Sequence, residues 1–294
     1  MSKDLSIIII SYNTKTLTVE CIKSALRYQK KINAEIIVVD NNSNDDSAFA
    51  ISKMGVKLIK NKTNKGFSGA NNQAAKLAAG KYLLFLNSDT LISKDIFSSS
   101  IDYLNKNKKI GFYSVGLRNK DGSYQEAGGY FPTLPRVFAW MMFIDDLPIL
   151  SNIIQSYHPK INFYKVPRRL DWVKGTCMFV RKEAWDGVQG FDEDYFMYVE
   201  DIDICYKGKK LGWDAYYDPK NDILHYGGAS STSDFPLTSE ISGLRRFYSN
   251  YYSTGEQILL RFILKFGSFM RMILFGFLKD PKYFSIYKKV YYVS

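Results

Sequence analysis

Apolar runs and helix-like patterns alternate through the first ninety residues of the chain. Four runs lack polar alternation, which is typical of strands covered on both faces of a parallel sheet. They are LSIIII (5–10), EIIVVD (35–40), VKLI (56–59) and KYLLFL (81–86). Apolar residues at four-residue spacing from Leu17 to Tyr28 predict a helix, and a second helix is predicted between a cap at Ser68 and a stop at Gly80. This order predicts a doubly wound α/β layer.

Polar residues follow each of these four strands. They are Ser11 to Asn13, Asp40 to Asn42, Asn61 to Lys65 and Asn87 to Asp89. Such residues also stop strands and begin turns, which is the simpler explanation for any one of them. However, an open parallel sheet binds its ligands beyond the carboxyl ends of its strands. Four polar tips at one edge therefore favour a pocket over four unrelated turns.

The alternation loosens after residue 110. Residues 110–135 are predicted to form strands and turns, whereas 134–168 show no sustained periodicity and are predicted to be a flexible excursion over the surface. The segment 170–185 returns to a strand-like pattern, and 191–213 ends in a predicted helix. The residues of that helix that should face inward are Ile202, Cys205 and Tyr206.

The end of the chain is basic and apolar at once. From Arg245 onward it carries nine basic and two acidic residues, so +7 of the net charge of +11 lies there. A helix with a wide apolar face and a basic stripe can lie in a membrane interface, with its cations toward anionic lipid. The alternative is a helix that packs on the domain or on a partner subunit. The predicted polar face consists of Arg261, Lys265, Ser268 and Lys279, with Arg271 at its border.

Composition narrows the class of protein. A hydrophobic content of 46% over 294 residues excludes a disordered chain. Three scattered cysteines and two histidines exclude a Cys- or His-rich metal cage and make a reduced, cytosolic setting the default. Neither a signal peptide nor a run of about 20 apolar residues is present, so we expect a chain that does not cross a membrane. The charge would suit a nucleic-acid-binding protein, but no such motif appears.

Eight motifs occur in this order along the chain: SIIIISYN, EIIVVDNNSNDDS, NKGFSGANN, FLNSDT, DWVKGTCMFVRKEAW, QGFDE, MYVEDIDICYKGKKLGW and HYGGAS. With them the chain resembles the family 2 glycosyltransferases with a GT-A fold, especially the bacterial rhamnosyltransferase-like branch, over roughly residues 5 to 230. The resemblance implies an α/β fold with a mostly parallel central sheet flanked by helices. It also implies a glycosyltransferase domain over 1–240, with a donor half to about 115 and an acceptor half after it, and an amphipathic helical tail over 241–294.

The implied activity is inverting sugar transfer. The donor would be dTDP-L-rhamnose or a UDP-sugar, and the acceptor a saccharide hydroxyl, lipid-linked, in cell-surface polysaccharide synthesis. The protein would then act in the cytoplasm, at the inner face of the cell membrane, with a homo-oligomer left open. The alternative is a nucleotide-sugar-binding or scaffolding homologue with weakened chemistry, for which Asn87 is the support.

The resemblance also implies roles for residues at the strand tips. Asp40 would accept a hydrogen bond from the N3–H of uracil or thymine, with Asn13 lining the same pocket. Lys65 would offer a cation and Gly66 backbone freedom at a helix amino end, which favours anionic groups, although an ordinary loop and cap explains them equally well. Further donor-binding residues would be Ser11, Asn71, Asn87 and Ser88.

The metal and the base are implied in the same way. Asp89 matches the last aspartate of the family's Asp-x-Asp motif and His225 its metal-site histidine, which would hold Mg²⁺ or Mn²⁺. Asn87 departs from the two-carboxylate form and puts strict metal dependence in doubt. Asp201 would be the general base, with Glu200 as the fallback.

A structural role is the alternative for the acidic residues of this helix. The helix dipole alone favours Glu200 and Asp201 in a first turn, and Asp203 would form an ion pair with Lys207 at the surface. Trp172, Lys174 and Gly175 would lie beside the donor sugar and acceptor. For Trp172 a place in the core is an equal alternative.

Overall fold

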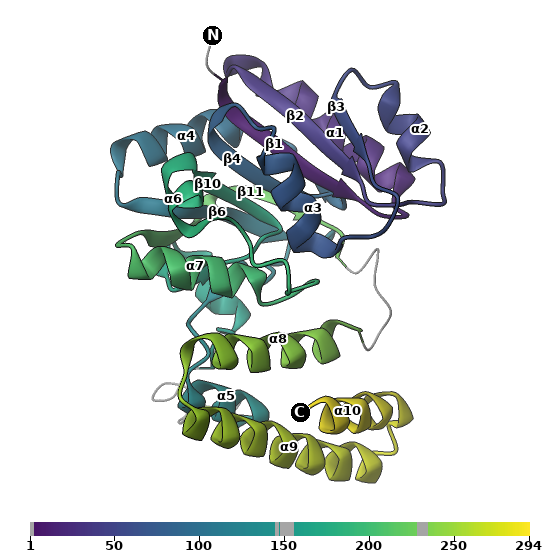
Figure 1. Cartoon of the computed structure of the whole chain (residues 1–294), viewed down its shortest axis with the longest axis vertical. Helices are drawn as coiled ribbons and strands as arrows, with labels where there is room; N and C mark the ends of the chain where they lie inside the picture. Colours follow the sequence, from purple (N-terminus) through teal and green to yellow (C-terminus); the bar gives the residue numbers. More distant parts are fainter. Residues whose placement is uncertain (1–2, 145–146, 148–155, 228–234) are drawn as a thin grey trace. The chain divides into compact units, whose positions relative to one another are not determined.

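The strands predicted at the start of the chain pair in parallel (Figure 1). The computed structural model describes residues 3–144, 147, 156–227 and 235–294. Ser11 lies opposite Asp40, and Ile10 opposite Asn87, so three strands end at the same edge of the sheet. The three strands are β1 (Lys3–Ser11), β2 (Ala34–Asp40) and β4 (Gly80–Asn87). A fourth strand, β3 (Lys57–Lys60), pairs in parallel with β2.

The remaining strands make the sheet mixed. In the described part of the chain it has nine strands, in the order β3-β2-β1-β4-β10-β6-β11-β5, with β8 also on β11. β6 and β11 are parallel to each other, while β10, β5 and β8 are antiparallel to their neighbours. A short pair, β7 (Gly128–Gly129) and β9 (Trp172–Val173), lies apart from it. The bounds are β5 (Thr90–Leu91), β6 (Ile110–Arg118), β8 (Arg168–Leu170), β10 (Cys177–Arg181) and β11 (Asp214–His225).

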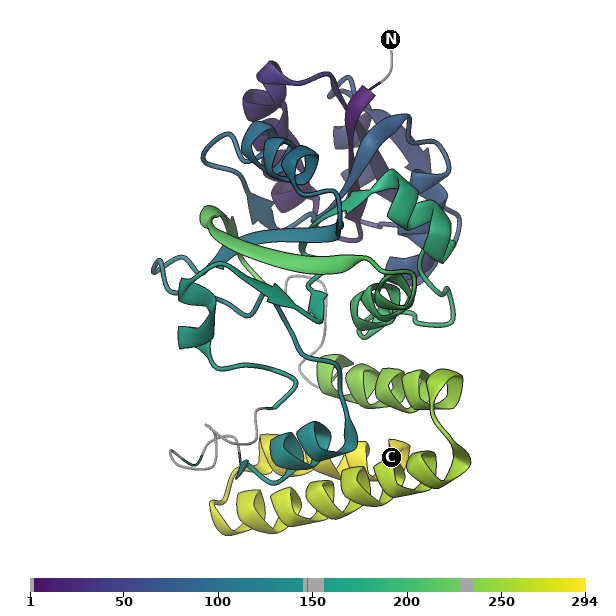
Figure 2. The same cartoon turned by 90° about the vertical axis from the view of Figure 1, so that its left-hand side faces the viewer.

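Helices cover both faces of the sheet (Figures 1 and 2). Tyr82 of β4 donates a hydrogen bond to Asn105 of α4 at 2.8 Å on one face. Phe85, three residues on and therefore on the opposite face, packs against Trp185 of α6 at 4.8 Å between ring centroids. The first face carries α1 (Lys15–Tyr28), α2 (Ser47–Ser52) and α4 (Phe97–Lys106), and the second α3 (Gly66–Ala75) and α6 (Lys182–Val188).

The predicted cap of the second helix is wrong. α3 begins at Gly66, and Ser68 is buried inside it without a capping bond. Other groups accept the first N–H bonds: the Asn64 side chain accepts from Gly66 at 2.9 Å, and the Phe196 carbonyl from Phe67 at 2.7 Å. Gly80, the predicted stop, is already the first residue of β4.

The predicted helix after residue 191 is confirmed as α7 (Glu200–Lys210). Ile202 and Cys205 are buried, as predicted. Asp203 and Lys207 do form an ion pair, at 2.7 Å. However, Asp203 is fully buried, so the pair is not the surface pair that the sequence suggested.

The chain divides into two units, and the second contains more than the predicted tail. Unit 1 comprises Met1–Gly129, Lys160–Phe196 and Glu200–Ser230, and unit 2 comprises Tyr130–Pro159, Met197–Val199 and Ser231–Ser294. The predicted boundary at residue 240 thus differs from the observed division.

Part of the segment predicted to be a flexible excursion over the surface belongs to unit 2. Residues 134–141 form helix α5, and 161–165 of unit 1 form a 3₁₀ helix, whereas 145–146 and 148–155 lie outside the described residues. Met141 of α5 packs against Gly267 of α9, which explains why this segment joins the C-terminal helices. The helices of unit 2 are α5 (Leu134–Met141), α8 (Phe235–Tyr251), α9 (Thr254–Phe277) and α10 (Pro281–Val293).

The predicted polar face of α9 is partly wrong. Ser268 is buried and donates to the carbonyl of Leu264 at 2.7 Å. Arg271 is also buried: its Nε donates to the Met141 carbonyl at 3.1 Å, and its guanidinium lies 4.0 Å from the ring of Phe143. The side of the helix that carries these polar groups therefore faces the interior of unit 2. Packing against α5 decides this orientation, which a helical projection of α9 alone does not reveal.

Candidate active site

The carboxylate of Asp40 lies at the tip of β2 with one oxygen unsatisfied. The residue is 3% exposed. Its Oδ2 accepts a hydrogen bond from the backbone N–H of Ser43 at 3.2 Å. Its Oδ1 is buried and has no hydrogen-bond partner among the described residues. Because a buried acceptor without a partner costs about 1–3 kcal/mol, this oxygen is suited to a donor that a ligand brings.

Asn13 lies beside the same turn. Its backbone N–H donates to Oγ of Ser43 at 3.0 Å, and its Oδ1 accepts from the N–H of Asn44 at 2.8 Å. Asn13 has a φ of 53°, a left-handed conformation that Asn tolerates better than most residues. The tips of β1 and β2 are therefore bonded to each other around Asp40.

Asn41 holds the loops around this tip together. Its amide nitrogen donates to Oδ1 of Asn64 at 2.7 Å and to the carbonyl of Gly66 at 3.1 Å. Its Oδ1 accepts from the side chain of Asn61 at 2.9 Å and from the N–H of Lys65 at 3.0 Å. Sequence reasoning placed Asn41 among the polar residues at this strand tip but assigned it no role of its own. The repeated asparagines at two neighbouring strand tips were the available signal.

Ser11 and Ser88 lie at the two ends of a chain of hydroxyls. Ser11 is fully buried and contacts Thr18 at 3.0 Å, Thr18 contacts Thr14 at 3.0 Å, and Thr14 contacts Ser88 at 3.1 Å. Ser11 therefore uses its hydroxyl inside the protein. Ser88 is only half-buried and remains accessible at the tip of β4.

The glycine loop before α3, predicted to have backbone freedom, is closely packed against Phe196. Gly66 has a φ of +70°, and a Cβ there would lie 2.4 Å from the Phe196 carbonyl oxygen, so this position requires glycine. The first two N–H groups of α3 are already bonded, which leaves less of the helix end for an anion. Lys65 is exposed, whereas Asn71 is buried and donates to the carbonyl of Phe67 within the helix at 2.9 Å.

Asp89 and His225 meet at the edge of the site. Oδ1 of Asp89 lies 3.4 Å from Nε2 of His225. On the other side of the ring, Nδ1 lies 2.6 Å from Oε1 of Gln125. The Gln125 amide nitrogen donates to Oδ1 of Asn119 at 2.6 Å and to the His225 carbonyl at 2.8 Å, which fixes Oε1 toward the ring. Nδ1 therefore donates to Gln125, and Nε2, which is the acceptor nitrogen of the corresponding neutral tautomer, is turned toward the Asp89 carboxylate.

This pair fits a divalent cation in part. Two acceptors that face each other are stabilised by a cation between them or by protonation of the histidine, and an orienting partner on the far ring nitrogen is typical of metal-ligating histidines. In the described ranges, however, no cluster of three or more His, Cys, Asp or Glu residues could hold a metal. Mg²⁺ and Mn²⁺ take about six ligands, so the others would have to be substrate oxygens and water.

Glu200 and Asp201 begin α7 and are both buried. Oδ2 of Asp201 accepts from the N–H of Gly175 at 3.3 Å. The next residue, Thr176, accepts from the N–H of Asn87 at 2.9 Å, so Asp201 is connected to the tip of β4 through this short segment. Burial, followed by the neighbouring charge of Asp201, raises the pKa of Glu200 well above its ordinary value. The surroundings therefore disfavour the ionised form of Glu200.

The residues before this segment differ in their exposure. Trp172 is 2% exposed, so it belongs to the core and offers no face to a sugar. Lys174 is half-buried, with its Nζ 3.8 Å from Oε2 of Glu126. A Cβ on Gly175 would lie 3.1 Å from the ring of Phe67, so this residue allows α3 and the start of β10 to approach closely.

Comparison with known proteins identifies the family. Residues 6–176 match the family model described as glycosyl transferase family 2. The chain belongs to this family. Its resemblance to the rhamnosyltransferase-like branch is confirmed by similarity to the rhamnosyltransferase WbbL of Escherichia coli K12, with 31% identity over 184 residues. That match covers 58% of this chain and 64% of WbbL, so less than two thirds of that relative is represented.

A second relative comes from Mycobacterium tuberculosis H37Rv. It is named N-acetylglucosaminyl-diphospho-decaprenol L-rhamnosyltransferase and is 26% identical over 212 residues, which is 68% of each chain. Solved structures confirm the GT-A fold of this family 2 chain. The mannosyltransferase PcManGT from Pyrobaculum calidifontis, solved with GDP-Man and Mn²⁺, aligns with a TM-score of 0.59 at 15% identity. The alignment covers 99% of this chain and 74% of PcManGT.

Replacing Glu200 with Gln should stabilise the protein increasingly above about pH 4.5, the ordinary pKa of a glutamate. Because the folded state raises this pKa, folded Glu200 keeps a proton that the unfolded chain releases, and the free energy of unfolding falls as the pH rises. The side chain of glutamine does not titrate, so the variant does not undergo this fall in the free energy of unfolding. Thermal unfolding of both proteins, from about pH 5 to about pH 8, should show a Tm difference that widens with pH.

Glu183→Gln, at an exposed position of α6, is the matched control and should show no such trend. A Tm difference between wild type and Glu200→Gln that stays constant over the same pH range would contradict the raised pKa.

Proposed function

We propose that this family 2 chain is an inverting glycosyltransferase that moves a sugar from a nucleotide-diphospho-sugar to a hydroxyl of a lipid-linked saccharide. The observation that carries the proposal is the buried Asp201 carboxylate, which Gly175 holds beside the segment bonded to the tip of β4. The names of the relatives support the substrate classes, since they include rhamnosyltransferases and one that acts on a diphospho-decaprenol. Surface polysaccharide synthesis is the setting that these substrates suit.

Asp40 would recognise the base of the donor. Its unpaired Oδ1 can accept a hydrogen bond from the N3–H of uracil or thymine, which satisfies the buried acceptor. Asn13 borders the same turn and would line the pocket. Both dTDP-L-rhamnose and UDP-sugars carry this N3–H, so either donor is compatible.

Asp201 would act as the general base. Its carboxylate takes the proton of the acceptor hydroxyl while that oxygen attacks the anomeric carbon from the face opposite the diphosphate. The bond between the anomeric carbon and the diphosphate oxygen breaks as the new glycosidic bond forms, so the configuration inverts. Burial and the neighbouring charge disfavour the ionised form of Glu200, so we assign the base to Asp201.

Asp89 and His225 would hold a divalent cation, which when bound neutralises charge on the departing diphosphate. Gln125 keeps the His225 ring in the tautomer that ligation requires. Asn87 brings no second carboxylate, so binding should depend on the donor's own oxygens. Lys65, exposed before α3, offers additional positive charge.

Asp201→Asn should lower sugar transfer by about 10²–10⁴-fold, the usual contribution of a general base, with donor affinity nearly unchanged. The amide keeps the size of the side chain but cannot take a proton. Transfer to an acceptor analogue measures the rate, and calorimetry measures donor affinity.

Glu200→Gln is the matched control for this test and should retain activity. If Glu200→Gln loses transfer while Asp201→Asn keeps it, the two roles are reversed. If neither variant changes the rate, the chain lacks this chemistry and is a binding homologue.

His225→Ala should weaken Mn²⁺-supported donor binding by at least about tenfold, because even outer-shell partners of metal ligands contribute about 10–100-fold. Asp89→Ala should behave alike. Calorimetric titration of the donor, with Mn²⁺ and with EDTA, measures the effect. His158→Ala, at the other histidine of the chain, is the control; this residue lies 2.6 Å from Glu240 in unit 2. Equal donor affinity of the wild type in Mn²⁺ and EDTA would refute the metal site.

One face of α9 is apolar and exposed. Phe262 is 64% and Phe277 86% exposed, and the rings of Phe262 and Phe266 stack at 5.9 Å. Phe269 and Ile273 continue the same face at helical spacing. A contiguous exposed apolar face rimmed by polar residues typically marks an interaction site. In the part of the chain that the structure describes, no helix is long and apolar enough to span a bilayer.

This face of α9 would bind an anionic membrane surface. The charge argues for this occupant over a second copy of the chain, because the +7 net charge of the last fifty residues would repel its like. Arg261 and Lys265 flank the apolar face and are exposed, so they can contact lipid phosphates while the aromatic rings enter the interface. Such a location, peripheral on the inner face of the membrane, would bring the enzyme to a lipid-linked acceptor.

The double variant Phe262→Ser/Phe269→Ser should lose association with vesicles of acidic phospholipid, since each buried aromatic ring contributes on the order of 1.5–3 kcal/mol. Co-flotation with vesicles measures the binding. Phe49→Ser/Leu77→Ser is the control, because both residues are exposed in unit 1. If the wild type stays with the soluble fraction and sediments as a dimer, the face is a contact between two copies.

A further inference from the structure

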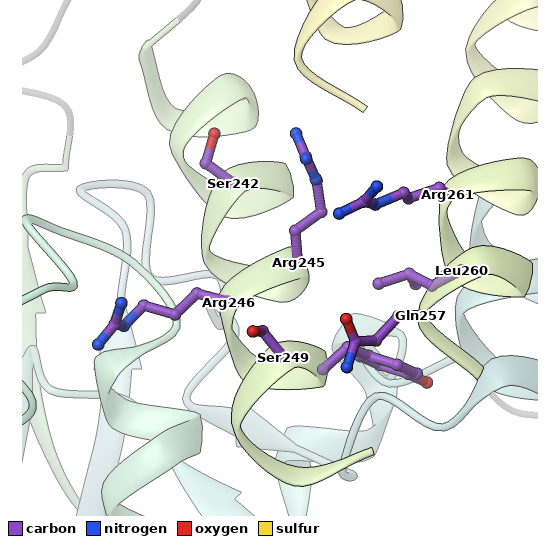
Figure 3. Close-up of a pocket in the computed structure, with 8 residues that line it drawn as sticks. Ser242, Arg245, Arg246, Ser249, Gln257, Leu260 and Arg261 are labelled. Atoms are coloured by element: carbon purple, nitrogen blue, oxygen red, sulfur yellow. The ribbon is translucent and has the colours of Figure 1, made fainter. Parts of the chain in front are cut away.

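A polar cavity of about 300 Å³ lies between α8 and α9 in unit 2 (Figure 3). This volume is at the lower end of the range for small-molecule sites, about 300–1,000 Å³. Three of its lining residues are arginines and none is acidic. Of the other five lining residues, four offer hydroxyl or amide groups and one, Leu260, is apolar. The full lining is Ser242, Arg245, Arg246, Tyr248, Ser249, Gln257, Leu260 and Arg261.

Two of the arginines face the same space. Figure 3 shows the side chains of Arg245 and Arg261 turned toward each other between the two helices, whereas Arg246 points to the other side of α8. Arg245 is half-buried and donates through one terminal nitrogen to the carbonyl of Val293. Its Nε is buried and has no hydrogen-bond partner among the described residues. Arg245 is thus anchored by α10 and still has a donor to offer.

Arg261 is the exposed member of the pair. In the described ranges it forms no ion pair and no hydrogen bond with another side chain. Two guanidinium groups that share a space repel each other unless an anion lies between them. The cavity therefore has the charge, the unused donors and the size of an anion site.

The donor arrangement favours phosphate over a carboxylate. A guanidinium presents a planar fork that binds phosphate oxygens in pairs. Two such forks on different helices need an anion with oxygens on several sides, which a phosphate or diphosphate has and a carboxylate lacks. Ser242 and Gln257 can donate to the remaining oxygens.

The neighbouring residues indicate where this phosphate comes from. Phe262 follows Arg261 directly and belongs to the exposed apolar face of α9, and Lys265 lies one turn further on. When that face enters a membrane, the side chain of Arg261 lies at the level of the lipid headgroups. We propose that the cavity between α8 and α9 binds the phosphate or diphosphate headgroup of a lipid. This inference rests on the proposed function, in which the acceptor is carried on a lipid diphosphate.

The test measures vesicle binding of Arg261→Ala. Three kinds of phosphatidylcholine vesicle are compared: without additive, with a polyprenyl diphosphate, and with phosphatidylglycerol at the same negative charge. Lys282→Ala, at an exposed position in the first turn of α10, removes the same charge outside the cavity and is the matched control. Arg261→Ala should bind polyprenyl diphosphate vesicles about tenfold or more weakly than wild type, since bonds between charged groups are the strong ones. Lys282→Ala should remain within about twofold.

A second variant separates charge from geometry. Arg245→Lys keeps the positive charge but removes the Nε donor and the fork, and it should also weaken binding to the diphosphate vesicles. Thermal unfolding of each variant is the control for folding. A Tm equal to that of wild type shows that the variant is folded and that the loss of binding has another cause.

The outcomes distinguish the lipid sources. A loss confined to polyprenyl diphosphate vesicles assigns the cavity to the lipid carrier, and an equal loss on phosphatidylglycerol vesicles assigns it to membrane phospholipid. If Arg261→Ala binds both as well as Lys282→Ala does, the cavity is not a phosphate site. If inorganic diphosphate in solution binds wild type and Arg261→Ala with equal affinity, the cavity is likewise not a phosphate site. Since the readout is binding, a failure of the proposed sugar transfer would leave these results unchanged.

Discussion

Four hydrogen bonds to the side chain of Asn41 hold the site at the strand tips in place. They join the loop after β2 to the loop after β3 and to the first residue of α3. With both amide hydrogens and the carbonyl oxygen in use, Asn41 satisfies groups that would otherwise be buried without partners. Asp40, directly before it, is thereby fixed with one oxygen bonded to the turn and the other unpaired. The proposed donor site depends on this arrangement, because a rigid buried acceptor can select a ligand by the hydrogen-bond donor that the ligand carries.

Helix α9 of the second unit buries an arginine and exposes apolar side chains, which is the reverse of an ordinary surface helix. Arg271 is buried, where the carbonyls of Trp140 and Met141 and the hydroxyl of Tyr287 accept from it. The phenylalanines of α9 face outward instead. A buried guanidinium is tolerated when its donors are satisfied, and an exposed apolar face is stable at a membrane. The cavity beside this face is lined by Arg245 and Arg261, and it is where we propose that a lipid headgroup binds.

The sequence predicted the strands and their polar tips well because parallel strands have a strong local signature. The run that ends at Asp40 is apolar without alternation, as expected of a strand covered on both faces, and it does pair in parallel with β1. Local sequence patterns gave wrong predictions where contacts with residues far away in the sequence determine how a helix begins or which side it buries. The cap of α3 comes from Phe196, more than a hundred residues away, and the buried side of α9 is set by Met141. Trp172 shows the same limit, since a sequence does not reveal whether a tryptophan faces a ligand or the core.

The selectivity of Asp40 between nucleotides tests the central claim most directly. Uracil carries an N3–H that Asp40 can accept, whereas N3 of cytosine is itself an acceptor. Calorimetry with UDP and CDP should show wild type binding UDP about 10–100-fold more tightly, as expected for a hydrogen bond to a charged group. Asp40→Asn, whose amide can donate to cytosine, should reduce or reverse this preference. Equal binding of UDP and CDP by the wild type, or an unchanged preference in Asp40→Asn, would contradict the account.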